Sequence, residues 1–63
     1  MKARSVEIFD DQGNLDKIEV TLETGVHLFD AVWDPTDEQN EDNRIAFREW
    51  VKRVTLRNGH ELT

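Results

Sequence analysis

The 63-residue chain has no cysteine, no tyrosine, one proline, three glycines and no long apolar run. Without cysteine, disulfides cannot stabilise the fold, and a chain this short buries a small share of its surface. The N-terminal residues lack the apolar segment of a secretory signal, and no stretch is long enough to span a membrane. We therefore expect a single domain over residues 1–63 that works in the cytoplasm.

Acidic residues dominate the charge, and they are unevenly placed. The formal net charge is −6, with twelve acids and three bases in residues 1–43 and two acids and five bases in residues 44–63. Phosphates would be repelled by such a surface, so we do not expect direct binding to free nucleic acid. The acidity indicates a basic partner, a need for solubility, or both.

Two segments alternate apolar and polar residues, which is typical of half-buried strands. The first covers residues 5–9, with Val6 and Ile8 on one face, and the second covers residues 17–23. Between them lies a segment rich in turn-forming residues, in which Gly13 can adopt a positive φ. The pattern predicts a β-hairpin.

The remaining pattern predicts two helices and a last strand. Apolar residues at helical spacing predict a short buried helix over residues 26–33, ended before Pro35. A second helix is expected to begin at Thr36, which forms a capping box with Gln39, and residues 54–57 alternate like a strand. The predicted fold is α+β with the order β-β-α-α-β, a small three-stranded sheet with two helices packed on one face.

The acids of residues 34–42 provide the main functional hypothesis. Asp34, Asp37, Glu38 and Glu41 follow the spacing i, i+3, i+4 and i+7, which places them on one face of a helix. Carboxylates one turn apart are roughly 5–6 Å from each other, and each strand of duplex DNA presents a phosphate about every 3.4 Å. The column would therefore imitate a phosphate backbone.

A simpler interpretation is a solvated helix face. Carboxylates in a first turn are favoured by the helix dipole, which by itself accounts for Asp37 and Glu38. On the functional interpretation an exposed apolar residue, Ile45, lies among the acids as an interface anchor. The predicted partner-binding residues are Asp30, Asp34, Asp37, Glu38, Glu41, Asp42 and Ile45, and whether Asp10 and Asp11 join them is left open.

Nothing in the sequence indicates catalysis. Calcium-binding loops starting at Asp34 or Ile8 lack the required ligands, and neither His27 nor His60 has a metal-ligand partner at a suitable spacing. The only serine, Ser5, has no histidine and carboxylate arranged beside it, and the glycines are isolated. We expect no enzyme activity, no metal and no cofactor.

A small, cysteine-free, strongly acidic domain with this order of elements resembles the small acidic inhibitors encoded by phages, in particular the anti-CRISPR proteins that mimic DNA. The resemblance implies a monomeric inhibitor that occupies the basic DNA-binding site of a CRISPR effector complex in a bacterial host cell. The alternative is a structural or regulatory interaction module, similar to an antitoxin or a subunit. Such a module would bind through an apolar surface near Trp33 or at the sheet edge, and its charge would serve solubility.

Overall fold

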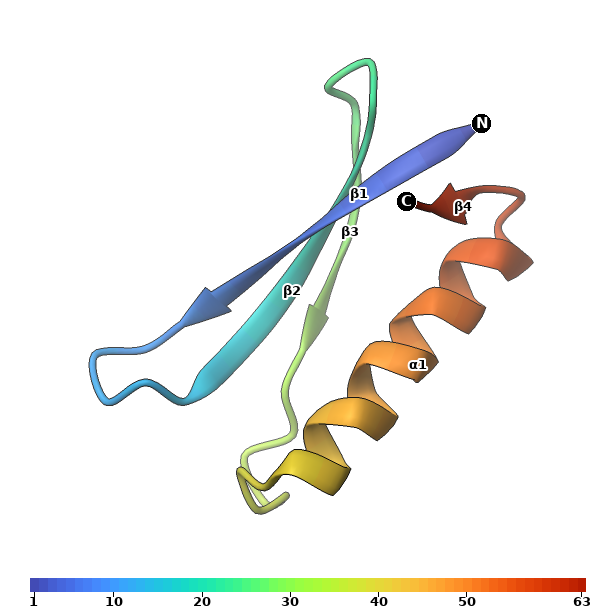
Figure 1. Cartoon of the computed structure of the whole chain (residues 1–63). Coiled ribbons are helices and arrows are strands. Elements are labelled where there is room, and N and C mark those ends of the chain that lie inside the picture. Colours follow the sequence, from blue (N-terminus) through green and yellow to red (C-terminus); the bar gives the residue numbers. More distant parts are fainter.

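One long helix lies along one face of a four-stranded sheet (Figure 1). The computed structural model describes all 63 residues. Its elements are β1 (Lys2–Phe9), β2 (Leu15–Leu22), β3 (His27–Val32), α1 (Glu41–Arg57) and β4 (Glu61–Leu62). The strand order is β3-β2-β1-β4, and β4 is parallel to β1. The α+β class is confirmed, but the prediction of three strands and two helices is wrong, because the structure has four strands and one helix.

The predicted hairpin is confirmed, since β1 and β2 pair antiparallel from Ala3 opposite Leu22 to Ile8 opposite Lys17. The turn is held by the carboxylate of Asp10, which accepts the backbone N–H groups of Gln12 and Asn14, each at 2.9 Å. Gly13 adopts a φ of 81°, which is the conformation that favours glycine there. The turn brings the acids of the hairpin to one end of the sheet.

The helix predicted over residues 26–33 is wrong, because His27–Val32 forms strand β3. A β-bulge explains the error: Val20 lies opposite Phe29, and the next residue of β2, Thr21, lies opposite His27, so that Leu28 is extra. Leu28 and Phe29 consequently both pack against the core. Two successive apolar residues on one side break the strand alternation and produce a spacing that resembles a helix.

Helix α1 begins at Glu41, so the predicted start at Thr36 is wrong. The N-cap is Asn40, whose side chain accepts the backbone N–H of Asn43 at 2.8 Å. The helix continues to Arg57, so the strand predicted over residues 54–57 is also wrong and forms the last helical turn instead. The short final strand, β4, follows Gly59.

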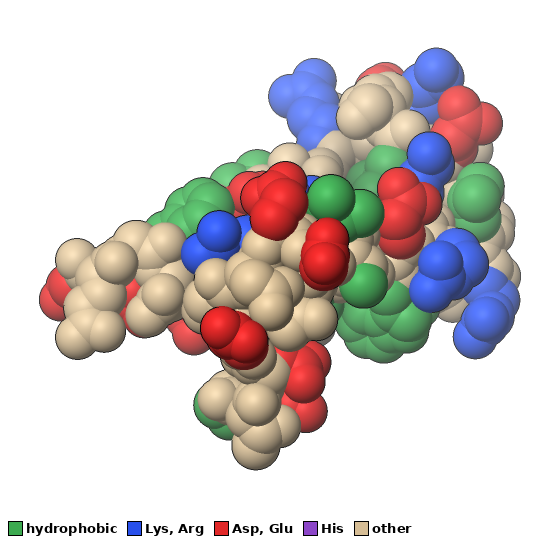
Figure 2. Space-filling view, turned by 60° about the horizontal axis from the view of Figure 1, so that its bottom comes forward, with side chains coloured by type: hydrophobic (Ala, Val, Ile, Leu, Met, Phe, Trp, Pro, Cys, Tyr) green, Lys and Arg blue, Asp and Glu red, His purple; other side chains and the backbone are tan.

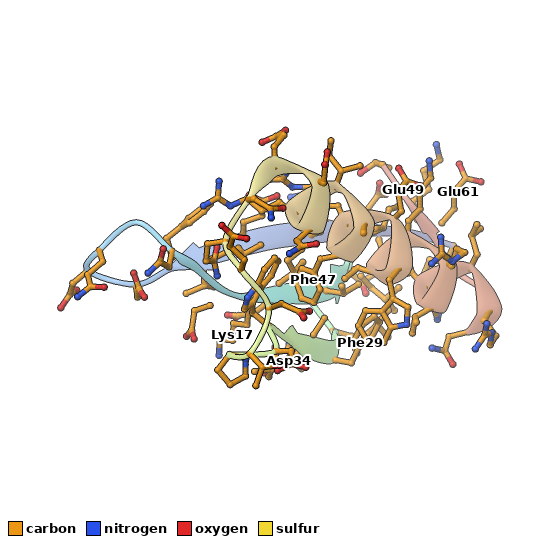
Figure 3. The ribbon with its side chains drawn as sticks, turned by 90° about the horizontal axis from the view of Figure 1, so that it is seen from below. Lys17, Phe29, Asp34, Phe47, Glu49 and Glu61 are labelled. Carbon is orange, nitrogen blue, oxygen red and sulfur yellow. The ribbon has the colours of Figure 1, made fainter.

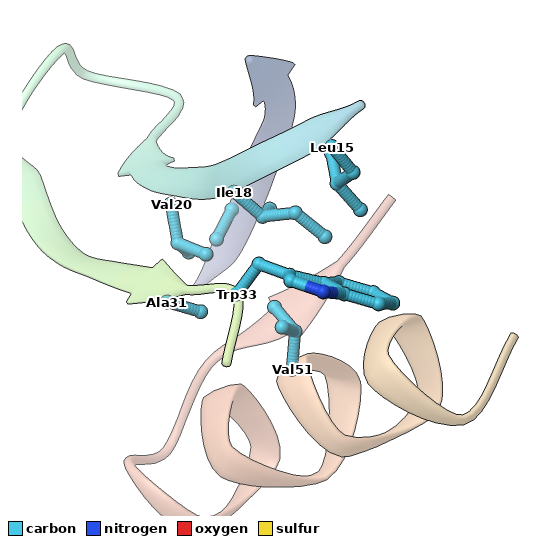
Figure 4. Packing of buried hydrophobic residues seen from close by; sticks show 7 residues of the cluster. Leu15, Ile18, Val20, Ala31, Trp33 and Val51 are labelled. Atoms are coloured by element: carbon cyan, nitrogen blue, oxygen red, sulfur yellow. The ribbon is translucent and has the colours of Figure 1, made fainter. Parts of the chain in front are cut away.

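The core is thin and lies between the sheet and the helix (Figure 4). It contains seven buried apolar residues, Ala3, Leu15, Ile18, Val20, Ala31, Trp33 and Val51. Trp33 is 7% exposed and packs edge-to-face on Phe47 of α1, with ring centroids 5.1 Å apart. Ile18 and Val20, which alternate with polar residues along β2, are both buried in this core.

The face of β1 that carries its buried residue is not the face of Val6 and Ile8. Ala3 is its buried residue, and Val6, which the alternation places on the opposite face, is 53% exposed. Trp50, whose helical spacing with Phe47 and Val51 indicates a core position, is 46% exposed. Much of the apolar surface of this chain therefore remains outside the core.

Replacing Trp33 with Ala is expected to unfold most of the protein. Truncating a buried Trp costs about 3–5 kcal/mol, which is a large part of the stability of a domain of this size. Trp33→Phe keeps a ring but loses the indole N–H, and we expect an intermediate loss. Urea unfolding followed by circular dichroism measures both variants, with Val32→Ala, at a neighbouring exposed position, as control. Equal unfolding midpoints for Trp33→Ala and Val32→Ala would contradict this role.

Candidate functional site

The loop of residues 34–40 is fixed against the end of the hairpin by side-chain hydrogen bonds. The side-chain amide of Gln39 donates to the backbone oxygen of Leu15 at 2.8 Å and accepts the backbone N–H of Leu15 at 3.0 Å. The indole N–H of Trp33 donates to the backbone oxygen of Asp37 at 3.2 Å. Gln39 thus bonds to Leu15 as a neighbouring strand would. The loop is therefore held in a defined position relative to β2.

This attachment brings acids from two distant segments together. A hollow of about 230 Å³ is lined by Asp10 and Asp16 of the hairpin and by Asp37 of the loop. We give the name acidic end to these three residues together with the other acids of the same two segments, Asp11, Asp34, Glu38, Glu41 and Asp42, which do not line the hollow themselves. Figure 2 brings this end forward and shows acidic side chains over its centre and lower part, with most basic ones toward the right and the top.

No basic residue lies within the two segments that form the acidic end, residues 10–16 and 34–42. Three bases lie nearby in sequence. Lys17 lies 3.9 Å from Asp30, and Arg48 lies 2.6 Å from Glu7, a hydrogen bond that raises the pKa of the Arg48 guanidinium. Arg44 borders the acidic end, where it donates to the side-chain oxygen of Gln39 at 3.4 Å. None of the ion pairs in the structure includes a carboxylate of the acidic end.

Asp34 is held in one orientation by its own loop. Its carboxylate accepts the backbone N–H of Thr36 at 2.9 Å and the hydroxyl of Thr36 at 2.8 Å. These two hydrogen bonds, the backbone one first, lower the pKa of Asp34. The carboxylate therefore remains ionised to a lower pH than a free Asp, although it is exposed.

The predicted helical column of carboxylates is wrong, since α1 begins only at Glu41. Asp34, Asp37 and Glu38 lie in the non-helical loop, and Glu41 and Asp42 lie in the first helical turn, where the helix dipole favours them. Of these five predicted residues only Asp37 lines the hollow, and the other four are its neighbours in the loop and in the first helical turn.

Of the two remaining predicted site residues, Asp30 lies apart from the acidic end and Ile45 borders it. Asp30 is on β3, where it faces Lys17 and lies 3.3 Å from the ring nitrogen of His27. Ile45 is 48% exposed on α1, one turn after Glu41. Figure 3, seen from below, shows Asp34 at one side of the molecule and Glu49 and Glu61 at the other.

Sequence reasoning missed Asp16 and left Asp10 undecided. Asp10 and Asp16 line the hollow together with Asp37 because Gln39 bonds across to the hairpin. The hairpin prediction already places Asp10 and Asp16 at the same end of the sheet, which is the signal available in the sequence. The contact between Leu15 and Gln39 that attaches the loop joins residues 24 apart in the sequence, and no local pattern indicates it.

No group of three or more His, Cys, Asp or Glu side chains is arranged to hold a metal ion. The one helix of the structure is not long and apolar enough to cross a membrane. Comparison with protein-family models, with curated proteins and with solved structures gave no match.

Replacing Gln39 with Ala is expected to loosen the acidic end. The backbone N–H and C=O of the buried Leu15 would lose their partners, which costs about 1–3 kcal/mol. The amide proton of Leu15 should exchange with solvent faster, and the urea midpoint should fall. Gln12→Ala, in the exposed hairpin turn, is the matched control. Unchanged exchange at Leu15 would show that Gln39 does not hold the loop.

Replacing Thr36 with Ala is expected to raise the pKa of Asp34 part of the way to its ordinary value, because the backbone hydrogen bond remains. Because the folded-state pKa of Asp34 is lowered, its contribution to stability is present above the unfolded pKa and is lost as pH falls through the folded pKa. NMR titration of the Asp34 carboxyl carbon measures the shift. Thr24→Ala, in the β2–β3 turn, should leave that titration unchanged, and an unchanged titration in Thr36→Ala would contradict the assignment.

Proposed function

We propose that this protein binds, through its acidic end, a basic site of another protein that normally holds nucleic-acid phosphates. The observation that supports this function is the hollow at which Asp10 and Asp16 of the hairpin meet Asp37 of the loop, within two segments, residues 10–16 and 34–42, that hold eight acids and no base. On this proposal the protein is a binding inhibitor and not an enzyme, and it acts without a cofactor.

Electrostatics favours such a complex. Charges separated by less than the Debye length, about 8 Å in physiological salt, act on a partner as one field. A site lined by Lys and Arg attracts that field at long range and gains the most where it would otherwise hold phosphates. The attachment of the loop through Gln39 supports the proposal further, because carboxylates held in place lose less freedom on binding than those of a flexible tail.

The resemblance to DNA-mimicking anti-CRISPR proteins suggests the class of target. We propose as partner the DNA-binding subunit of a CRISPR effector complex, blocked by a monomer of this protein in the cytoplasm of a bacterial host. A basic site in any other enzyme that holds DNA would present the same chemistry. A direct test therefore measures whether the protein competes with DNA for the basic site.

An interaction module that binds through an apolar surface is the second candidate. The observation that favours it is the exposure of several large apolar residues, among them Val32 at 67%, Leu56 at 52% and Ile45 at 48%. Trp33, which the sequence suggests as the centre of such a surface, is buried in the core and cannot serve. In this case the charge would keep the protein soluble, and binding would depend little on salt.

The test compares two variants with equal changes in net charge. One carries Asp37→Asn, Glu38→Gln and Glu41→Gln at the acidic end, and the control carries three Glu→Gln changes outside the acidic end, at Glu23, Glu49 and Glu61. Purified CRISPR effector complexes are mixed with duplex DNA and increasing protein, and bound DNA is measured at low and high salt. We expect the native chain and the control to displace DNA, and the acidic-end variant to be weaker by roughly tenfold or more.

The same proteins, immobilised, are used to capture binding partners from a bacterial lysate. Captured proteins should be released by added duplex DNA and by salt, and the acidic-end variant should capture little. Retention of binding by that variant, or capture that resists both DNA and salt, would overturn the proposal. Loss of binding in an Ile45→Asp variant with little salt dependence would instead support the apolar module.

A further inference from the structure

Strand β3 forms one edge of the sheet, and no other element pairs with its outer side. The backbone N–H of Trp33 donates to Asp16 of β2 at 2.9 Å, so the groups of Trp33 face inward. Because neighbouring residues of a strand face opposite ways, the backbone N–H and C=O groups of Asp30 and Val32 point outward. These four groups are free to pair with another strand.

An apolar hollow adjoins this edge on the helix side. Its volume is about 560 Å³, and it is lined by Leu28 and Phe29 of β3, Val54 and Asn58 of α1, and His60. The bulge of β3 supplies both of its strand residues, and Figure 3 shows Phe29 on the side of β3 toward the helix. A strand added beside β3 would project alternate side chains toward this hollow.

The helix side of this edge also offers an exposed aromatic surface. Trp50 lies one turn before Val54 on the same flank of α1 and is 46% exposed. Its ring stacks on Phe47 at 6.1 Å, which holds a large apolar surface at this flank.

The open face of the sheet, which is the face away from the helix, carries two like charges beside this edge. Glu19 of β2 lies directly opposite Asp30 of β3, and like charges in that position destabilise a sheet. Lys17 and His27 offset this only in part, because Lys17 is 3.9 Å from Asp30 and His27 contributes only when protonated. A positive side chain on a strand next to β3 would face Asp30 and relieve the repulsion.

We propose that the free edge of β3 binds an extended segment of a partner protein as a fifth strand. The segment carries a Lys or Arg opposite Asp30 on the open face, and its neighbouring residues place apolar side chains in the hollow against Phe29 and Val54, on the flank of α1 that also exposes Trp50. Main-chain hydrogen bonds to Asp30 and Val32 provide the pairing, as in other complexes formed by strand addition. The proposal is independent of the acidic end, since it uses a different surface.

A second copy of this chain fits the edge less well. Pairing two β3 strands would bring the Asp30 and Glu19 carboxylates of both copies to one region of the open face, where like charges repel. Each copy also carries a net charge of −6. A basic segment of another protein meets neither obstacle.

The test uses a capped heptapeptide, Thr-Ile-Lys-Val-Lys-Ile-Thr, and its counterpart with Glu in place of both Lys, titrated into isotopically labelled protein. We expect the Lys peptide to shift the amide signals of β3 and the indole signal of Trp50, and to slow amide exchange at Asp30 and Val32. Asp30→Lys should weaken the Lys peptide by roughly fivefold or more and strengthen binding of the Glu peptide. Asp11→Lys makes the same change in net charge in the hairpin turn and should have little effect.

The outcomes separate the possible occupants. Preference for the Glu peptide in Asp30→Lys, together with loss of binding when the Lys peptide is N-methylated along its pairing edge, supports the proposal. Shifts centred on the acidic end, or equal weakening by Asp30→Lys and Asp11→Lys, would overturn it. Concentration-dependent shifts along β3 without peptide would also overturn it, since they would identify a second copy as the occupant.

Discussion

The packing of Trp33 between the sheet, the helix and the loop is the constraint on which the rest of the structure depends. The helix contributes only Val51 to the group of buried apolar residues, so the edge-to-face contact of Trp33 with Phe47 carries much of its attachment to the sheet. The indole N–H also fixes the backbone at Asp37. Trp33, which directly follows β3, therefore packs on α1 and fixes the acidic loop, so one side chain connects three parts of a protein whose core is thin.

The acidic end follows from this constraint and from a second one, the pairing of Gln39 with Leu15. Gathering carboxylates raises the free energy of the folded state by repulsion, and the chain offsets this cost only locally. Asp34 is stabilised by its hydrogen bonds to Thr36, and the carboxylates in the first turn of α1 by the helix dipole. At the hairpin, Asp10 accepts two backbone N–H groups, and Asp11 and Asp16 are held there by the fold of β1 and β2.

The hairpin could be predicted from the sequence because its signals are local: strict alternation in β2 and a turn built around Gly13. The other elements could not, because tertiary contacts overruled the local pattern. The bulge at Leu28 gave β3 a helix-like spacing. Thr36 and Gln39 fit a capping box, yet in the structure Thr36 bonds to Asp34 and Gln39 bonds across to the hairpin. The helical column predicted for the acids of residues 34–42 was wrong, because the capping signal at Thr36 does not start the helix, and the meeting of Asp37 with Asp10 and Asp16 depends on a contact that no local pattern shows.

The placement of charge bears on the proposal that the acidic end binds a partner. Solubility requires net charge, and that charge costs the least stability when it is spread over the surface. This chain instead concentrates eight carboxylates at one end and leaves its late helical bases, Lys52, Arg53 and Arg57, outside that end. Arg48 against Glu7 shows that bases are set beside acids where the helix meets β1. No ion pair includes a carboxylate of the acidic end, so Arg44 and Arg48 at its border offset the repulsion only in part and a basic partner, as proposed, would offset it further.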